Sequence, residues 1–359
     1  MKSNYNGLSF YDKQAARRIN IADNLRGVLL MKKIIITGFS GFVSGHFIDY
    51  LYNNSIDWEV FGISRSNPAF DYEKYKDRLS ITFYRMDLMD AVMLKKVFLE
   101  VKPDYVLHLA AFSSVAYSWK HPEESFTNNS NIFLNLIDAV RDTVPGCRVL
   151  SVGSSEEYGN VLHDDLPIKE KQPLCPVSPY AVARVSQELL SKVYVDAFGM
   201  QLIMTRSFNH IGPGQDVRFV IPSFINRILD IKYSGKEKGE IETGDLSIVR
   251  DFVDVRDVVD AYYLLLTKGK VGEVYNICSE KGVKLSEVVR IISEEIGVEV
   301  TTKITPDYVR PNDNCEIVGS SYKIQTELGW KKNITFRDTI KDMINAQIVK
   351  RKELLKKHT

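Results

Sequence analysis

The chain has 359 residues, of which 44% are hydrophobic and 26% are charged, an ordinary composition for a soluble globular protein of two domains or one large domain. Its 47 basic and 46 acidic residues leave a formal net charge of +1, which argues against a nucleic-acid or anionic-membrane partner. No apolar run reaches the roughly 18–20 residues that span a bilayer, so no membrane segment is predicted.

The cysteines and the first residues concern the cellular compartment. Cys147, Cys175, Cys278 and Cys315 are widely spaced and form no CxxC pair, which predicts neither a zinc site nor a disulfide framework. Isolated thiols are typical of a cytoplasmic protein, and we predict that location. Residues 1–30 lack the apolar core and cleavage site of a signal peptide, and we interpret them as an N-terminal extension, with a translation start at Met31 as the alternative.

From Met31 onward, short β-branched runs alternate with longer helical patterns. The apolar runs predict strands at residues 33–37, 59–63, 81–84, 105–109, 148–152 and 201–205. The helical patterns predict helices at residues 41–52, 90–101, 123–143, 180–198, 285–296 and 336–349.

This alternation predicts an α/β fold of the Rossmann type, a doubly wound parallel sheet with helices on both faces. We assign residues 31–208 mainly to that NAD(P)-binding domain. Beyond about Asn209 the alternation breaks down, with Gly212, Pro213, Gly214 and Pro222 as punctuation. Residues 209–359 are therefore predicted to form a smaller mixed α/β lobe for substrate, with some strands and helices returning to the first domain. Ligands of such sheets bind at the carboxyl ends of the strands.

The loop after the first predicted strand, TGFSGFVSG, is rich in glycine. Glycine lets backbone N–H groups approach a pyrophosphate at the start of a helix. The loop joins a strand to a helix, as a dinucleotide site requires, and this favours cofactor binding over a plain turn. The cofactor-binding residues predicted here are Gly38, Ser40, Gly41, Phe42 and Val43.

The second predicted strand runs into Ser64 and Arg65. An acidic residue there would bind the ribose 2′-hydroxyl of NAD, whereas serine and arginine suit the 2′-phosphate of NADP. NADP(H) is therefore the favoured cofactor and NAD(H) the alternative, under which Arg65 is an ordinary solvated side chain. Asp87, after the third strand, is interpreted as a ligand of the adenine amine or as the cap of the following helix.

Two further segments carry groups suited to carbonyl chemistry. Ser154 follows a predicted strand, and Tyr180 and Arg184 lie four residues apart on one face of a predicted helix. A phenol is a poor acid–base at neutral pH unless a cation favours its ionised form, and a fixed charge one helical turn away does so. Together these groups favour carbonyl–alcohol interconversion beside a nicotinamide ring. Taken singly, such a tyrosine is more often a buried aromatic and such a serine a turn residue.

From Met31 to near the C-terminus, the chain resembles the extended short-chain dehydrogenase/reductase superfamily of nucleotide-sugar epimerases, dehydratases and reductases. The matching segments are, in order, TGFSGFVSG, DYVLHLAA, SVGSSEEYG, SPYAVAR, RSFNHIGPGQ, VRDFVDVRDVVDAY and RPNDNCEIVGS. Within them, SSEEYG and FNHIGPGQ are most similar to bacterial GDP-4-keto-6-deoxy-D-mannose reductases, which make GDP-D-rhamnose.

The resemblance implies roles for residues of these segments. Gly38 and Gly41 would belong to the pyrophosphate loop, and Ser154, Tyr180 and Arg184 to the catalytic set. At the adenine it places Asp87 and Leu88, and at the nicotinamide it places Leu109, Ala110 and Ala111. The substrate contacts it implies are Ser113, Ser155, Asn209, Arg250 and Arg310. The two arginines would grip the nucleotide diphosphate with their forked guanidinium groups. By analogy with the family, the chain is also expected to form a homodimer.

Two positions depart from the family's pattern. Ser44 stands where the cofactor loop usually has its third glycine, which supports close packing of helix and strand, and Gly45 follows one place late. Arg184 stands where the family has the lysine of its Tyr-x-x-x-Lys motif. Arginine keeps the charge, but it is wider and releases no proton in a relay, which predicts slowed or altered activity.

The favoured function is NADPH-dependent reduction of the 4-keto group of a GDP-linked 6-deoxy-hexose. Tyr180 would protonate the forming alkoxide, and Ser154 would hydrogen-bond the same oxygen. One alternative is a 4,6-dehydratase of the GDP-mannose type, in which Glu156 would move protons instead of being a polar turn residue. An epimerase is a further enzymatic alternative. A non-catalytic nucleotide-sensing protein, motivated by Arg184 and Ser44, is the alternative of another class.

Overall fold

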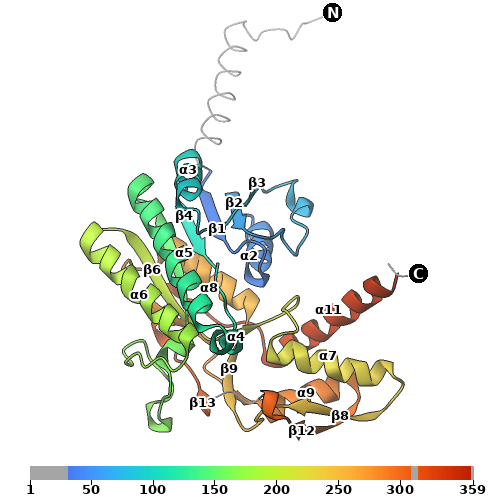
Figure 1. Cartoon of the computed structure of the whole chain (residues 1–359). Coiled ribbons are helices and arrows are strands. Elements are labelled where there is room, and N and C mark those ends of the chain that lie inside the picture. Colours follow the sequence, from blue (N-terminus) through green and yellow to red (C-terminus); the bar gives the residue numbers. More distant parts are fainter. Residues whose placement is uncertain (1–30, 309–313, 357–359) are drawn as a thin grey trace, which may run out of the picture.

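The computed structural model describes residues 31–308 and 314–356, and a seven-stranded sheet forms the centre of its larger part (Figure 1). The strands stand in the order β10-β6-β5-β4-β1-β2-β3, and every neighbouring pair is parallel. Their bounds are β1 Lys33–Thr37, β2 Glu59–Ser64, β3 Ile81–Arg85, β4 Tyr105–His108, β5 Arg148–Ser154, β6 Gln201–Ser207 and β10 Val274–Ile277. The predicted Rossmann-type sheet is confirmed.

Helices cover both faces of this sheet because its strands send alternate apolar side chains to opposite faces. Ile34 and Ile36 of β1 pack with α2 and α8, whereas Ile35 packs with α3 and α5 on the other face. The helices around the sheet are α2 Phe42–Asn53, α3 Ala91–Val101, α4 Val115–Lys120, α5 Pro122–Thr143, α6 Pro179–Phe198, α8 Val255–Lys268 and α10 Tyr322–Leu328. Within the described ranges, no helix has both the length and the apolar character needed to cross a membrane.

Much of the chain after Asn209 forms a smaller mixed lobe, in the lower part of Figure 1. Its central strand is β9, which pairs in parallel with β7 and β13 and antiparallel with β11, while β8 pairs in parallel with β12. Three helices and these strands enclose a separate apolar core. The bounds are β7 Asn209–Ile211, β8 Lys238–Thr243, β9 Val249–Asp254, β11 Gly282–Lys284, β12 Glu299–Ile304, β13 Glu316–Ile317, α7 Val220–Tyr233, α9 Leu285–Ile296 and α11 Phe336–Lys356.

The sequence did not predict α7, because Pro222 was interpreted as punctuation. The structure places Pro222 at the third position of α7. The N–H groups of a first helical turn have no partner within the helix, so a residue that lacks this group is tolerated there. The proline therefore lies inside a helix without breaking it.

The second half of the chain also completes the first sheet. β9 runs directly into α8, and Asp254 caps this helix by accepting the N–H of Arg256 over 2.8 Å. After α8, β10 returns to the sheet and pairs with β6. Because β7 follows β6 after a single residue, the carboxyl ends of the central strands lie where the two lobes meet. Candidate site residues from both halves of the chain therefore converge there.

Candidate active site

The glycine-rich loop between β1 and α2 lies at the carboxyl end of the sheet. Gly38 has a φ of +69°, and a Cβ there would lie 2.8 Å from the backbone nitrogen of Ala110, so only glycine fits. The N–H of Gly41 donates to the carbonyl oxygen of Gly38 over 2.9 Å, and Gly41 is the N-cap of α2. The other predicted residues of this loop are Ser40, Phe42 and Val43. The backbone N–H groups at the start of α2 suit a pyrophosphate, so the loop fits a dinucleotide cofactor.

Ser44 replaces the third glycine without disturbing this loop. Its side chain is fully buried, with Oγ 2.8 Å from the carbonyl oxygen of Phe39 and 2.9 Å from that of Gly41. The hydroxyl donates to loop carbonyl groups instead of meeting a neighbouring strand. The loop therefore accommodates the first of the two departures from the family's pattern.

The end of β2 adjoins the same loop. Ser66 Oγ donates to Ser40 Oγ over 3.1 Å, and the guanidinium carbon of the exposed Arg65 lies 5.1 Å from the centre of the Phe112 ring. Ser64 is buried and donates to the carbonyl oxygen of Ser66 over 2.6 Å. Of the two residues predicted to select NADP, Arg65 is thus the one exposed at this corner. An exposed cation beside two hydroxyl groups suits a phosphate monoester.

The structure corrects one interpretation of Asp87. Its Oδ1 accepts the N–H of Met89 over 3.0 Å, in the turn before α3. The cap of α3 is Asp90, which accepts the N–H of Met93 over 2.9 Å. The capping role of Asp87 is therefore wrong, because the helix begins later than that role requires. Asp87 is exposed beside the buried Leu88, and its adenine role stays a prediction.

The end of β4 forms the other wall of the loop. Nδ1 of the buried His108 lies 2.8 Å from Thr37 Oγ1, which also accepts the N–H of Ala110 over 3.3 Å. Burial, and to a smaller extent the charge of Arg184, lower the pKa of His108 to about 3, so its imidazole is neutral at physiological pH. These bonds connect the backbone around residues 109–111 to β1 and so fix its position. The resemblance places the nicotinamide against this segment.

Ser154 and Tyr180 lie on neighbouring elements at the carboxyl end of β5. Ser154 is the last residue of β5, and Tyr180 lies in the first turn of α6, which packs against that strand. The start of α6 is set by Ser178, whose Oγ accepts the N–H of Ala181 over 3.1 Å. Tyr180 is only 6% exposed. The structure therefore brings the predicted pair to the same edge of the sheet.

Arg184 lies one turn further along α6 and contacts Tyr180. Its Nε donates to the Tyr180 hydroxyl over 3.2 Å, and its Nη1 donates to the carbonyl oxygen of Val152 over 3.1 Å, in the strand that ends at Ser154. Arg184 is 5% exposed. A fixed positive charge thus lies against the phenol oxygen, as the sequence interpretation required, and it links α6 to β5.

Sequence reasoning missed a buried polar network behind Ser154. Glu157 Oε1 accepts the N–H of Ser154 over 2.7 Å, so close to β5 that a Cβ on Gly153 would lie 2.4 Å from it. Beside it, Glu188 forms an ion pair with Arg206, both side chains being buried. Burial and then the charge of Glu188 raise the pKa of Glu157 to about 8. The spacing of Ser154 and Glu157 was the available signal, since it is that of a capping box.

Glu157→Gln should remove a pH-dependent cost to stability. The pKa of Glu157 is raised from near 4.5 to about 8, so between these values the folded chain holds a proton that the unfolded chain has released. The free energy of unfolding of the wild type therefore falls as pH rises through this window, and this fall ends above it. Between pH 4.5 and about 8, the free energy of unfolding of the variant should rise relative to that of the wild type by at most about 1.4 kcal/mol per pH unit.

Urea unfolding at about pH 5, 6.5 and 8 measures this gain. Glu123→Gln, at an exposed position of α5, is the matched control and should show no trend. A stability difference between Glu157→Gln and wild type that stays constant with pH would contradict the assignment of a retained proton to Glu157.

Three of the predicted substrate residues lie around the junction of the lobes. Ser113 is exposed in the loop after β4, and Ser155 is buried in the turn that follows Ser154. Asn209 begins β7 and pairs with Phe252 of β9. These placements agree with a substrate that lies between the sheet and the smaller lobe.

The two predicted diphosphate arginines differ in what the structure describes. Arg250, on β9, is 7% exposed, and its Nη1 donates to the carbonyl oxygens of Val249 over 2.9 Å and Asn314 over 2.7 Å. Arg250 lies two residues from the β9 partner of Asn209, so Arg250 and Asn209 are on the same face of this small sheet. Arg310 lies outside the described residues.

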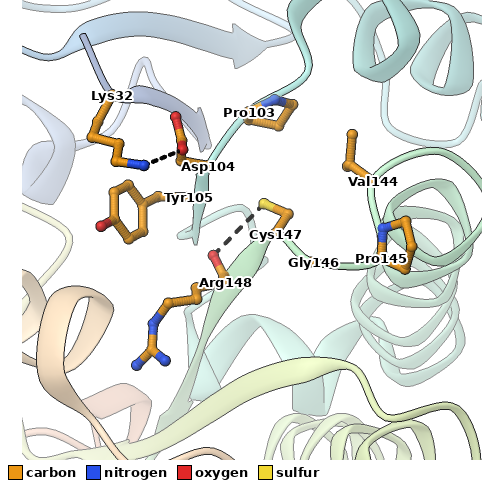
Figure 2. A pocket seen from close by; sticks show the side chains of 9 residues that line it. All are labelled: Lys32, Pro103, Asp104, Tyr105, Val144, Pro145, Gly146, Cys147 and Arg148. Carbon is orange, nitrogen blue, oxygen red and sulfur yellow. Dashed lines mark hydrogen bonds and ion pairs between the residues drawn. The ribbon is translucent and has the colours of Figure 1, made fainter. Parts of the chain in front are cut away.

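A hollow of 370 Å³ lies at the amino ends of the strands, on the side of the sheet opposite to the candidate site (Figure 2). Lys32, Tyr105 and Arg148, at the amino ends of β1, β4 and β5, help to line it. Lys32 forms an ion pair with Asp104, and Arg148 donates to the carbonyl oxygen of Leu266 over 2.7 Å at the end of α8. These charged groups hold elements together, and the hollow lies away from the strand ends that carry the candidate site.

The fold and site define a class of protein: a nicotinamide-dependent enzyme of the extended short-chain dehydrogenase/reductase type. The chain belongs to the GDP-mannose 4,6-dehydratase family, whose pattern matches residues 35–343. This confirms the superfamily predicted from the sequence.

Three relatives show which activities and cofactors occur among similar proteins. The chain is 30% identical over 316 residues to the GDP-6-deoxy-D-mannose reductase of Pseudomonas aeruginosa, which covers 88% of this chain and 97% of that protein. The structure of RMD from Pseudomonas aeruginosa complexed with NADPH is similar with a TM-score of 0.76 and 29% identity, over 89% of this chain and 99% of that one. DesIV, a dTDP-glucose 4,6-dehydratase from Streptomyces venezuelae with NAD bound, has a TM-score of 0.77 and 26% identity, over 89% and 98%. Both nicotinamide cofactors thus occur among the relatives.

Proposed function

We propose that the chain is a reductase that uses NADPH to convert the 4-keto group of a GDP-linked 6-deoxy-hexose into a hydroxyl. The observation that carries this proposal is the hydrogen bond from Arg184 Nε to the Tyr180 hydroxyl. This bond lies in α6, beside the end of β5 at which Ser154 is the last residue. General acid–base catalysis at a carbonyl oxygen is favoured by a phenol that a fixed positive charge contacts. The GDP-6-deoxy-D-mannose reductase among the relatives supports the GDP-linked substrate and the reductive direction.

Each residue of the candidate site has a distinct part in this reaction. The glycine-rich loop and residues 109–111 would hold NADPH, which when bound would supply the hydride that C4 of the sugar takes up. Tyr180 donates its phenolic proton to the C4 oxygen, so that one hydride and one proton convert the ketone to the alcohol. Ser154 donates a hydrogen bond to the same oxygen and stabilises the charge that develops there. Arg184 stabilises the phenolate through Nε, and because a guanidinium keeps its protons, the phenolate regains its proton from solvent.

The direct test mixes the purified chain with GDP-4-keto-6-deoxy-mannose and NADPH and follows the absorbance of the reduced nicotinamide. We expect stoichiometric loss of NADPH with formation of a GDP-deoxyhexose, and both at least about 100-fold slower with Tyr180→Phe. Absence of NADPH oxidation by the wild type would refute the proposal for this substrate.

Arg65 is expected to select NADPH over NADH. Arg65→Ala should raise the KM for NADPH by about tenfold, the value of one charge-assisted hydrogen bond at a partly exposed site, and leave the KM for NADH within about twofold. Steady-state kinetics with both cofactors measure this ratio. Arg78→Ala, whose guanidinium is held by Asp57 away from the cofactor loop, is the control and should change neither value. Equal changes for both cofactors would contradict the assignment.

A 4,6-dehydratase is the second candidate because of Glu156. This residue follows Ser154 by two positions and is half-buried in the same turn, and its N–H donates to Ser154 Oγ over 3.2 Å. A carboxylate beside the reacting sugar can move protons. A dehydratase regenerates its cofactor, so it would convert GDP-mannose without added reductant. Cofactor binding without turnover of either sugar would instead favour a nucleotide-sensing protein.

We also propose that the chain forms a homodimer through α6. Val182, Leu189 and Val193 form an apolar stripe on this helix and are 42%, 52% and 55% exposed. Figure 1 shows α5 and α6 side by side on the outside of the molecule. Light scattering after gel filtration measures the molar mass in solution. The double variant Leu189→Glu, Val193→Glu should have half the molar mass that the wild type shows. Val92→Glu, on the exposed side of α3, should leave it unchanged. A wild type that is already monomeric would refute this proposal.

A further inference from the structure

Arg184 replaces a flexible lysine with a planar group whose donors point in fixed directions. A lysine ammonium can turn any of three N–H groups toward a partner. A guanidinium must be held in one plane if its single Nε–H is to face the Tyr180 hydroxyl, which lies 3.2 Å away. An arginine at this position therefore needs a second contact that sets the plane of the group.

Gln187 makes that contact. Its Oε1 accepts a hydrogen bond from Arg184 Nη1 over 2.7 Å, shorter than the 3.1 Å from the same nitrogen to the carbonyl oxygen of Val152. Gln187 follows Arg184 by three positions and Tyr180 by seven, so the three side chains share the face of α6 that packs on β5. Gln187 is 1% exposed, so bulk water does not compete for its amide.

The amide of Gln187 is itself oriented by β5. Nε2 donates to Ser151 Oγ over 2.9 Å and to the carbonyl oxygen of Val152 over 3.2 Å. A flipped amide would set its NH2 group against Arg184 Nη1, donor against donor, and would lose the bond to Val152. The connected groups of Ser151, Gln187 and Arg184 therefore have one well-satisfied arrangement.

We propose that Gln187 is a positioning residue that fixes the plane of the Arg184 guanidinium and so allows an arginine to act in place of lysine in this chain. Within the described residues, the hydrogen bonds of Arg184 run from Nε and Nη1, so Nη2 would be the nitrogen available to a nicotinamide ribose when the cofactor is bound. The side chain of Gln187 is buried and bonds to Arg184, Ser151 and Val152, so it acts through Arg184. The inference rests on the cofactor site and the Tyr180 chemistry of the proposed function.

A double-mutant cycle tests the inference with Gln187→Met, Arg184→Lys and the combination of both. Methionine keeps the length of the side chain and removes its strong hydrogen-bonding groups. In the wild-type background, Gln187→Met should raise the Kd for NADPH and lower kcat by about tenfold each, with the KM for the sugar nearly unchanged. In the Arg184→Lys background the same change should cost less than about threefold, because an ammonium group has no plane to fix.

Two further variants separate positioning from general damage. Tyr194→Phe lies further along the same helix, where the hydroxyl of the 8% exposed Tyr194 donates to Asp138 over 2.7 Å without contacting Gln187 or Arg184. It should lower the thermal midpoint while leaving kcat and the Kd for NADPH within about twofold. Ser151→Ala releases the Gln187 amide with a smaller change of volume, so it tests the inference should Gln187→Met not fold. It should act in the same direction as Gln187→Met, and more weakly.

The outcomes distinguish this inference from the proposed function. An equal cost of Gln187→Met in both backgrounds, or no cost in either, overturns the positioning role. NADPH binding, followed by cofactor fluorescence, needs no turnover. If NADPH binding shows coupling between Gln187 and Arg184 but the wild type does not reduce the keto sugar, the proposed function is refuted and the positioning role of Gln187 stands. Turnover without coupling would sink the inference alone.

Discussion

Tyr180→Phe is expected to lower kcat by about 10²- to 10⁴-fold, the share of catalysis that a positioned acid–base group supplies. The substitution removes the oxygen to which Arg184 Nε donates, and it keeps the ring whose centre lies 5.2 Å from the guanidinium carbon. No other phenol is held by Arg184 within the described residues, so the C4 oxygen would take its proton from water. Binding of NADPH should change by less than about threefold, because Arg184 keeps its contacts with Val152 and Gln187.

The control for this variant lies on the same helix. Tyr194 is 8% exposed, and its hydroxyl donates to Asp138 over 2.7 Å, away from the candidate site. Tyr194→Phe therefore removes the same atom from a comparably buried ring and should leave kcat within about twofold of wild type. Single-turnover measurement of NADPH oxidation compares the chemical steps directly. A Tyr180→Phe enzyme that kept more than about a tenth of wild-type kcat would exclude Tyr180 as the proton donor.

Arg206→Met is expected to destabilise the fold by about 3–5 kcal/mol, because it leaves a buried carboxylate without its main partner. Nε and Nη2 of Arg206 each lie 2.8 Å from an oxygen of Glu188, and the two side chains are 4% and 3% exposed. Burial is the largest single influence on Glu188 and opposes its ionisation, but the hydrogen bonds and charges of Arg206 and Lys192 together outweigh burial and lower the pKa of this carboxyl. Without Arg206, Glu188 would keep its contact with the half-exposed Lys192, and Glu157 would remain close by.

Urea unfolding near pH 7 measures this loss, and the pH dependence identifies its cause. A carboxyl with a lowered pKa stabilises the fold above its unfolded pKa and loses that contribution as pH falls through its folded pKa. The difference in free energy of unfolding between wild type and Arg206→Met should therefore narrow as pH falls below about 4.5, the ordinary pKa from which that of Glu188 is lowered. Adding Glu188→Leu to Arg206→Met should recover more than about half of the loss, since no buried charge then remains unpaired. A loss below about 1 kcal/mol, or a gap that does not narrow, would contradict the prediction.

Local sequence was sufficient for much of the first sheet and for the motifs at its edge. β1 over Lys33–Thr37 and α9 over Leu285–Ile296 begin and end at the predicted residues. A β-branched run and an amphipathic period are properties of neighbouring residues, so they can be identified without knowledge of the fold. Gly38, Ser154 and Tyr180 were identified for the same reason, since each lies in a short motif beside a predicted strand or helix.

Tertiary structure decided the partners of these elements and the support of the site. β10 is a strand of four residues that adds to the sheet beside β6, and β9 gathers β7, β11 and β13 from segments before and after it. Such short strands carry little pattern of their own, because distant partners stabilise them. The hold of Gln187 on Arg184 and the pair of Glu188 with Arg206 likewise exist only where α6 packs against β5 and β6. The sequence by itself determined which groups are the candidates for the chemistry. Packing between distant segments decided which buried polar groups orient these candidates, because a hydrogen-bond partner is a matter of position in space.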